Sequence, residues 1–185
     1  MRKYKLGNIA EINFGPHQKY KAEAEVKYLL ASHFNKLYQP EFFKDSFLDL
    51  NAKTEKYLLQ KNDLLLTGKG NNIFAWAYSE DFGKTIASSL FYVIKTNPNL
   101  ILNEYLAYYL NTSKMIAKLK ILGSGATVRS IPKKELFALT IEIPSLEEQK
   151  HFIKIANTSK KNIELTKNIL HLKTNLHQAL VNRLQ

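Results

Sequence analysis

The C-terminal part of this sequence lacks any residue that interrupts a helix. Neither Gly nor Pro occurs after Pro144. Ser145 follows directly and can cap a helix N-terminus, and Glu148, three residues later, can complete a capping box. Glu147 and Glu148 also suit the positive end of the helix dipole. The sequence therefore predicts one long helix over residues 145–185.

Apolar residues recur along this helix at alternating spacings of four and three. They are Leu165, Ile169, Leu172, Leu176 and Ala179. This spacing predicts an apolar stripe along one face, which is typical of a helix that packs against a partner helix. Asn162 lies on the same stripe, seven residues before Ile169, where a lone polar residue can set the register of the pairing. The helix could instead fold back on its own domain, although its length argues against this.

The composition is that of a basic protein that can form a core. Hydrophobic residues make up 45% of the chain, which is ordinary for a globular protein. The 27 basic and 16 acidic residues give a formal net charge of +11. A positive excess of this size favours a polyanionic partner, most often nucleic acid. The alternative is a surface that is simply rich in lysine.

The positive charge is concentrated between Thr112 and Lys134. This stretch has six basic residues and no acidic one: Lys114, Lys118, Lys120, Arg129, Lys133 and Lys134. Lys114 and Lys118 are one helical turn apart, so both can point at the same stretch of solvent or phosphate. We call these six residues the basic block. Positive charge clustered in this way is more than a solubility charge spread evenly over the surface.

Residues 1–144 have the pattern of a mixed α and β domain. Strands are expected at 10–14, 26–30, 56–59, 64–67, 73–78, 85–94 and 136–143. One helix is expected after a cap at Asn103, and a second after a cap at Thr112 or Ser113, ending at Gly123. Turn residues, mainly Gly, Pro, Asn and Asp, separate these segments. We therefore predict an α+β chain, with a mixed-sheet domain at 1–144 and one long helix at 145–185.

No pattern of residues typical of catalysis, cofactor binding or metal binding stands out. Gly68-Lys69-Gly70 lacks both the spacing and the hydroxyl residue of a Walker motif, so it favours a tight turn. Glu25-Val26-Lys27 matches the end of a metal-dependent nuclease site, but residues 1–24 contain no Asp to share the metal. The five histidines are not spaced as metal ligands. We expect a protein with no catalytic residue, no cofactor and no metal.

Targeting signals are weak. The charged N-terminus has no apolar stretch behind it, and no apolar run approaches the length of a membrane span. The chain has no cysteine, which fits a reducing compartment. We expect a soluble, cytoplasmic protein that does not associate with a membrane.

Five segments, in this order, resemble those of specificity subunits of type I restriction–modification systems. They are LGNIAEI (6–12), KNDLLLTGKG (61–70), NEYLAYYLN (103–111), IPKKEL (131–136) and LTIEIPSLEEQ (139–149). The last is similar to the family's IpiPpleEQ segment. Asn62 replaces the usual Gly of the family, which alters only a turn. Asn71-Asn72-Ile73 replaces the family's usual Gly-rich continuation, as expected where a domain reads its own DNA target.

The resemblance implies a fold and a function. Specificity subunits carry two target-recognition domains, each followed by a long helix, and the two helices pack antiparallel. This chain has one domain and one helix, so it resembles a half subunit, or one half of a longer protein. Two copies could pair through their helices as a homodimer that reads a split, palindromic site in double-stranded DNA.

The resemblance also implies partners. The helices of the family dock modification subunits, which hold S-adenosylmethionine and methylate adenine, and through them the restriction subunit. This chain would then direct catalysis by its partners while binding neither cofactor nor nucleotide itself.

Three groups of residues are candidates for contact with DNA. Phosphate contacts need Lys or Arg on loops and helix ends, which fits the basic block. Base readout needs forked or amide side chains, which fits Lys69, Asn71, Asn72 and Arg129. Lys19, Tyr20 and Lys21 form a third candidate loop. For each residue, a solvated surface position is the alternative.

Three other functions stay open. A sequence-tolerant binder of RNA or single-stranded nucleic acid could use the 10 Phe and 10 Tyr side chains as stacking platforms. A metal-dependent nuclease with an unfamiliar site is the second. The third is a coiled-coil assembly protein, which the basic block makes less favourable.

Overall fold

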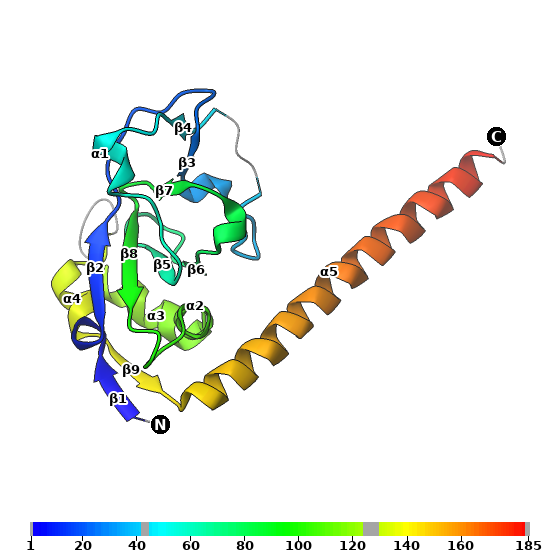
Figure 1. The fold of residues 1–185 in the computed structure, drawn as a ribbon. Helices are drawn as coiled ribbons and strands as arrows, with labels where there is room; N and C mark the ends of the chain where they lie inside the picture. Colours follow the sequence, from blue (N-terminus) through cyan, green and yellow to red (C-terminus); the bar gives the residue numbers. More distant parts are fainter. Residues whose placement is uncertain (1, 42–44, 124–129, 184–185) are drawn as a thin grey trace. The chain divides into compact units, whose positions relative to one another are not determined.

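The structure, a computed structural model, describes residues 2–41, 45–123 and 130–183. The chain divides into two compact units, Met1–Leu146 and Glu147–Gln185. The first unit contains both strands and helices, and the described part of the second unit is helical (Figure 1). The predicted α+β fold with a long C-terminal helix is confirmed.

An antiparallel sheet, four-stranded over the described residues, runs through the middle of the first unit (Figure 1). In spatial order its strands are β2 (Ala10–Phe14), β8 (Phe91–Thr96), β5 (Asp63–Thr67) and β6 (Ala75–Ala77). Leu64, Leu65 and Leu66 of β5 are fully buried, so both faces of this strand are covered. β2 lies at an edge of the sheet, and its residues Glu11 and Asn13 are exposed.

A second, mixed sheet is three-stranded within the described ranges. Its strands, in order, are β4 (Phe47–Leu48), β3 (Val26–Leu29) and β7 (Thr85–Ala87). β3 is antiparallel to β4 and parallel to β7. A separate pair, β1 (Arg2–Lys5) and β9 (Thr140–Ile143), joins the two ends of the first unit.

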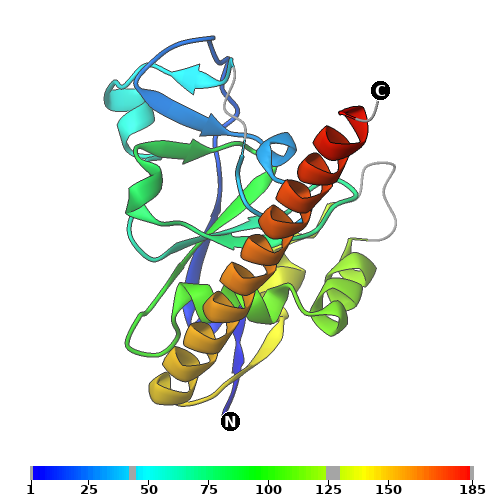
Figure 2. The same cartoon turned by 90° about the vertical axis from the view of Figure 1, so that its right-hand side faces the viewer.

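The helices lie at opposite ends of the first unit. The α-helices are α1 (Ala52–Glu55), α2 (Asn103–Leu110), α3 (Ser113–Leu122) and α4 (Lys133–Ala138), and 3-10 helices occur at Leu6–Asn8, Ala31–His33 and Glu80–Phe82. In both views α1 lies near β3 and β4 at one end, whereas α2, α3 and α4 lie at the other (Figures 1 and 2).

Residues from both sheets form one aromatic-rich core. Phe74 is 1% exposed. Its ring centroid lies 4.7 Å from that of Phe34, 5.1 Å from that of Tyr38 and 6.0 Å from that of Phe91. The same cluster contains Leu29, Leu59, Leu65, Trp76, Tyr78 and Ala87. The aromatic residues between 31 and 41, which show no clear period in sequence, thus contribute to the core.

Three of the predicted strands are wrong in whole or in part. Residues 56–59 do not form a strand, because they come directly after helix α1. The Asn51 side chain starts this helix by accepting hydrogen bonds from backbone N–H groups. Residues 85–94 are interrupted by a turn, closed by a 3.0 Å hydrogen bond from the Phe91 N–H to the Ser88 carbonyl. As a result β7 and β8 belong to different sheets. The first half of 136–143 completes α4, and only β9 is extended.

A buried histidine ties two segments of the first unit together. The Nδ1 atom of His33 accepts a hydrogen bond from the Leu30 N–H at 3.1 Å, and its Nε2 atom lies 3.2 Å from the Ser46 hydroxyl. Because Nδ1 acts as an acceptor, the neutral ring carries its proton on Nε2. Burial lowers the pKa of His33, since desolvation disfavours the charged ring.

His33 is therefore expected to make stability depend on pH. The unfolded chain binds the proton near its ordinary pKa of about 6.5, while the folded chain binds it only at lower pH. The free energy of unfolding should thus decrease as the pH falls below about 6.5, until the folded pKa is passed. His33→Asn keeps an acceptor for the Leu30 N–H and should remove the part of the pH dependence that protonation of His33 causes. Urea unfolding of both proteins between pH 5 and 8 tests the prediction, and parallel pH curves would contradict it.

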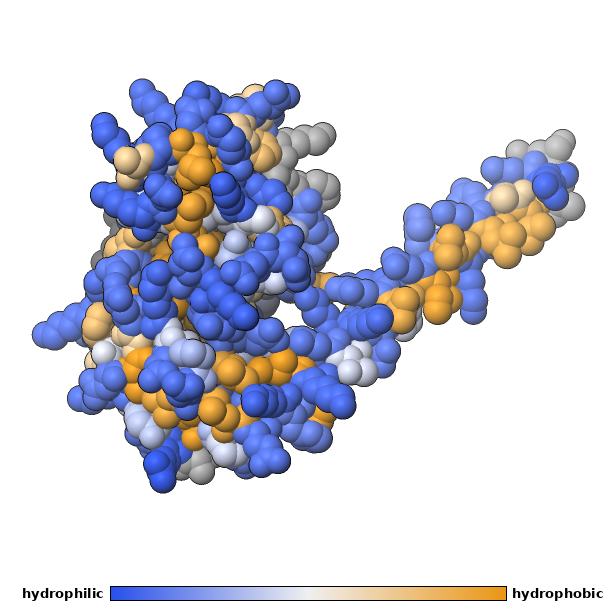
Figure 3. Space-filling view, in the orientation of Figure 1, coloured by the Kyte–Doolittle hydropathy of each residue, from blue (hydrophilic) through white to orange (hydrophobic). Residues whose placement is uncertain are grey.

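In the second unit, α5 (Leu146–Asn182) is a helix of 37 residues and about 55 Å. The residues of the predicted stripe, Asn162, Leu165, Ile169, Leu172, Leu176 and Ala179, lie on α5 and are exposed. Figure 3 shows apolar side chains following one another along this helix. Further exposed apolar residues, Ile163, Leu170, Leu180 and Val181, make the apolar surface wider than the sequence predicted.

None of the helices that the structure describes combines the length and the apolar composition that crossing a membrane requires.

Candidate nucleic-acid interface

Two of the predicted DNA-contact loops leave the four-stranded sheet at neighbouring positions. β2 and β5 both run antiparallel to β8, so their C-terminal ends lie on either side of the start of β8. The Gly15 N–H donates to the Phe91 carbonyl at 3.1 Å, and the Gly68 N–H donates to the Leu90 carbonyl at 2.8 Å. The loops that carry Lys19 and Lys69 therefore start beside the same turn.

The glycines at the two loop starts are required by close packing. A Cβ at Gly15 would lie 2.1 Å from the carbonyl oxygen of Ala87, and one at Gly68 would lie 2.6 Å from the Tyr92 ring. Real Cβ contacts do not come this close, so a side chain at either position would displace the turn between the loops.

We expect Gly15→Ala to lower the free energy of unfolding by about 1–3 kcal/mol, the usual range for overpacking. Gly123→Ala is the matched control, because the nearest described atoms, in the backbone of Ser130, would lie 3.6 Å from its Cβ. Urea unfolding of the two variants checks this prediction. Equal stabilities for both variants would show that the turn next to β8 is not tightly packed.

The loop after β2 is attached to β3 through a tyrosine. The Tyr28 hydroxyl donates to the Pro16 carbonyl at 2.7 Å and accepts from the Gln18 N–H at 3.2 Å. Lys19 and Tyr20 follow as exposed residues. Lys21 is also exposed, but its ammonium lies 2.5 Å from the Asp49 carboxylate. Its charge is therefore partly neutralised, and Lys21 is a weaker candidate for phosphate contact than Lys19.

The loop after β5 is closed by a threonine. The Thr67 hydroxyl donates to the Asn72 carbonyl at 2.9 Å and accepts from the Phe74 N–H at 2.8 Å. Asn71 and Asn72 are exposed at the far end of this loop. The loop is thus held at its base while its two amide side chains face solvent.

An aromatic stack lies between the two loops. Phe14 at the end of β2 stacks on Tyr92, with ring centroids 4.0 Å apart. The Lys69 ammonium lies 5.1 Å from the centroid of the Phe14 ring, within the range of a cation–π contact. The Tyr92 hydroxyl donates to the Ile131 carbonyl at 2.6 Å, which fixes the ring. Lys69 is therefore held beside an exposed aromatic surface.

The basic block approaches this site at Ser130. Lys69 forms an antiparallel bridge with Ser130, and the Ile131 N–H donates to the Gly68 carbonyl at 2.8 Å. α4 starts three residues after Ser130, with Lys133 and Lys134 exposed in its first turn. Thus the second half of the basic block begins next to the Lys69 loop.

α3 carries the first half of the basic block. Its apolar residues Met115 and Leu119 are buried, while its three lysines, Lys114, Lys118 and Lys120, are exposed. The Thr112 hydroxyl caps the helix by accepting a hydrogen bond from the Met115 N–H at 3.4 Å. After α3, Gly123 packs against the backbone of Ser130. The predicted residue Arg129 lies outside the described residues.

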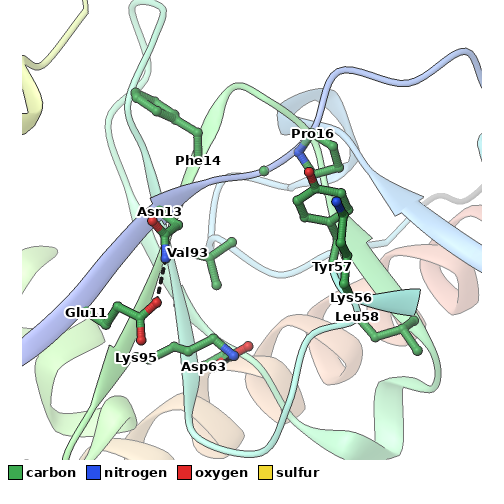
Figure 4. A pocket seen from close by; sticks show the side chains of 11 residues that line it. Glu11, Asn13, Phe14, Pro16, Lys56, Tyr57, Leu58, Asp63, Val93 and Lys95 are labelled. Atoms are coloured by element: carbon green, nitrogen blue, oxygen red, sulfur yellow. Dashed lines mark hydrogen bonds and ion pairs between the residues drawn. The ribbon is translucent and has the colours of Figure 1, made fainter. Parts of the chain in front are cut away.

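A pocket of about 310 Å³ opens beside β2 (Figure 4). Its lining includes Glu11, Asn13, Lys56, Tyr57, Asp63 and Lys95. Glu11, Lys95 and Asp63 are opposite one another on adjacent strands, so their side chains share one face of the sheet. The sequence did not identify these residues as a site, because only the strand register brings them together.

Asp63 is the buried member of this pocket. Its carboxylate accepts a hydrogen bond from the Gln60 N–H at 2.9 Å and lies 3.7 Å from the Lys95 ammonium. Burial raises the pKa of Asp63, while the Gln60 N–H and Lys95 partly oppose this shift. Among the described residues, no group of three or more His, Cys, Asp or Glu side chains is arranged to hold a metal ion.

Comparison with known proteins places this arrangement in a family. Residues 1–173 match the family described as the type I restriction modification DNA specificity domain. The match covers most of the chain, and the chain therefore belongs to this family. A stretch of 61 residues, 33% of the chain, is 41% identical to a protein of Methanocaldococcus jannaschii described as a type I restriction enzyme MjaX specificity subunit.

Solved structures share the fold. The S subunit of a type I restriction–modification system from M. genitalium matches 88% of this chain with a TM-score of 0.63 and 14% identity. The HsdS subunit from Thermoanaerobacter tengcongensis matches 88% of it with a TM-score of 0.55 and 16% identity. The chain spans 40% and 38% of these two proteins and 14% of the M. jannaschii protein.

Proposed function

We propose that this chain is a non-catalytic DNA-recognition subunit of a type I restriction–modification system, and that it reads one half of a bipartite duplex site. The observation that carries the proposal is that two exposed loops start beside β8, and that Lys69 of one of them is bridged to Ser130, three residues before the first lysine of α4. Lysines there can position the phosphate backbone, and amide side chains can contact base edges. Family membership supports a role in DNA specificity.

The proposed interface divides into two kinds of contact. Lys19, Lys114, Lys118 and the lysines of α4 are exposed cations that suit phosphates. Asn71 and Asn72 are exposed residues of the loop that Thr67 closes, and their amide side chains suit contact with base edges in a groove. Lys69, held by Phe14, lies between the residues that suit phosphates and those that suit bases.

We propose that α5 joins two copies of the chain, packed antiparallel as a homodimer, so that the complete reader contains two recognition domains. The exposed stripe from Leu165 to Ala179 supports this pairing, because water-exposed leucines at spacings of four and three are stabilised by a partner helix. Two identical domains would read a site made of two equal halves.

α5 also has apolar surface left for another partner. Ile163 and Leu170 are seven residues apart and lie about 100° or more around the helix from Ile169. A helix that covers the first stripe would leave them accessible. We propose that this second row docks the modification subunit, which would carry out adenine methylation and connect to the restriction subunit.

Selection from a random duplex library tests the DNA-reading role. The full chain should enrich duplexes with two fixed half-sites separated by a spacer of constant length. Equal binding to RNA or single strands, with no enriched duplex, would instead support a sequence-tolerant binder. Magnesium-dependent cleavage of the library by the pure chain would show a nuclease and contradict the proposal.

The lysines of α3 are expected to contribute through phosphates. The double variant Lys114→Gln and Lys118→Gln should weaken binding about equally for all sequences and reduce the slope of log Kd against log salt by about two. A matched control, Lys53→Gln with Lys84→Gln, removes the same charge from exposed positions outside the proposed interface. Titrations between 50 and 300 mM salt check the prediction. A slope change that is equal in both double variants would contradict it.

A further inference from the structure

Two polar residues on the edge strand β2 form a preoriented pair. Glu11 and Asn13 are two residues apart on the strand, so both side chains lie on the same face of the sheet, which lines the pocket (Figure 4). The Asn13 Nδ2 atom donates a hydrogen bond to the Glu11 Oε1 atom at 2.7 Å. A carboxylate only accepts, so the NH₂ group of Asn13 must face Glu11 and the amide oxygen must face away.

This pair presents mainly hydrogen-bond acceptors. The second carboxylate oxygen of Glu11 and the amide oxygen of Asn13 make no hydrogen bond with the part of the chain that the structure describes, and one N–H of Asn13 is left as a donor. In the major groove, adenine and cytosine present an amino group, whereas guanine O6 and thymine O4 are acceptors. An acceptor-rich pair therefore favours adenine or cytosine and disfavours guanine and thymine.

The neighbouring lysine does not cancel the charge of Glu11. Lys95 lies directly opposite Glu11 in the strand register, but its ammonium pairs with the buried Asp63 at 3.7 Å. On one side of the pair, the ammonium of the exposed Lys95 is thus engaged with the Asp63 carboxylate. At the other side, Phe14 is stacked on Tyr92 and fixes the end of β2. The pair is both exposed and held by ordered neighbours.

We propose that Glu11 and Asn13 are specificity-determining residues, which together select a base that presents an amino group, adenine or cytosine, at one position of the half-site. This inference rests on the proposed DNA-reading function. It assigns an acidic residue to the DNA surface, where a carboxylate is disfavoured near phosphates but can accept from cytosine N4 or adenine N6 in the groove.

Selection from a random duplex library with full-length variants tests the assignment. Glu11→Gln replaces an acceptor with a group that can also donate, so it should lower the preference for adenine or cytosine at one position by about tenfold or more. Asn13→Ala should relax the same position. Glu164→Gln, which removes the same charge from α5, should leave every position unchanged. Circular dichroism confirms folding of each variant.

The outcomes separate this inference from the proposed function. If the wild-type chain enriches a split site and both variants keep the wild-type preference at every position, Glu11 and Asn13 are not readout residues, while the proposed function stands. A uniform loss of affinity without a change at any one position also overturns the inference. If the wild-type chain enriches no duplex sequence, both the function and the inference fail.

Discussion

Alanine at Ile169, Leu172 and Leu176 is expected to convert a dimer of this chain into monomers at micromolar concentration. These side chains are 53%, 65% and 61% exposed on α5 and would be covered in a pair of helices. Truncating three such residues removes about 5 kcal/mol or more of apolar burial. This is close to four orders of magnitude in the dimer Kd. Sedimentation equilibrium of the triple variant and the wild type measures the effect.

A control on the opposite face separates pairing from helix formation. Glu164, His171 and Gln178 repeat every seven residues on the polar side of α5, so their replacement by alanine leaves the stripe intact. Alanine favours a helix, and the control should remain dimeric. A wild-type chain that is monomeric at tens of micromolar, or a control that dissociates equally, would contradict pairing through this stripe.

The second large effect is expected in the core of the first unit. Phe74→Ala removes a ring that contacts Phe34, Tyr38 and Phe91, and should lower the free energy of unfolding by about 3–5 kcal/mol. A typical domain is stable by only about 5–15 kcal/mol, so much of its stability would be lost. Urea unfolding followed by tyrosine and tryptophan fluorescence measures the change.

Leu90→Ala serves as the control for this substitution. Leu90 is exposed, and alanine keeps the carbonyl that accepts from Gly68. Its effect should stay within about 0.5 kcal/mol, as is usual for surface positions. Similar losses for both variants would mean that the aromatic cluster is not the main source of stability in this unit.

The sequence predicted α3 and α5, because residues close to the ends of these helices determine where they begin and end. α5 follows from the absence of Gly and Pro after Pro144, and α3 follows from a cap at Thr112 or Ser113, of which the structure uses Thr112, and a stop at Gly123. The alternation in residues 136–143 predicted a strand, but its first half forms α4. Burial of Leu136 there satisfies the helical period equally well.

Long-range pairing limited the prediction of the site. The ion pair of Lys21 joins it to Asp49, 28 residues away, so the partial neutralisation of its charge could not be predicted from the loop sequence. The pocket lined by Glu11 and Asn13 could not be predicted from the sequence, because only the register with β8 and β5 places these residues beside Lys95 and Asp63. The basic block, by contrast, is local in sequence; it was predicted from charge alone, and its contact with DNA stays a prediction.

Methylation mapping tests the central claim most directly. Genomic DNA would be sequenced for methyladenine in cells that express the partner modification subunit with and without this chain. The proposed function predicts methylation at one split sequence only when the chain is present, and a changed sequence when the loops after β2 and β5 are exchanged for those of another family member. Methylation that is independent of the chain, or that is spread over unrelated sequences, would contradict it.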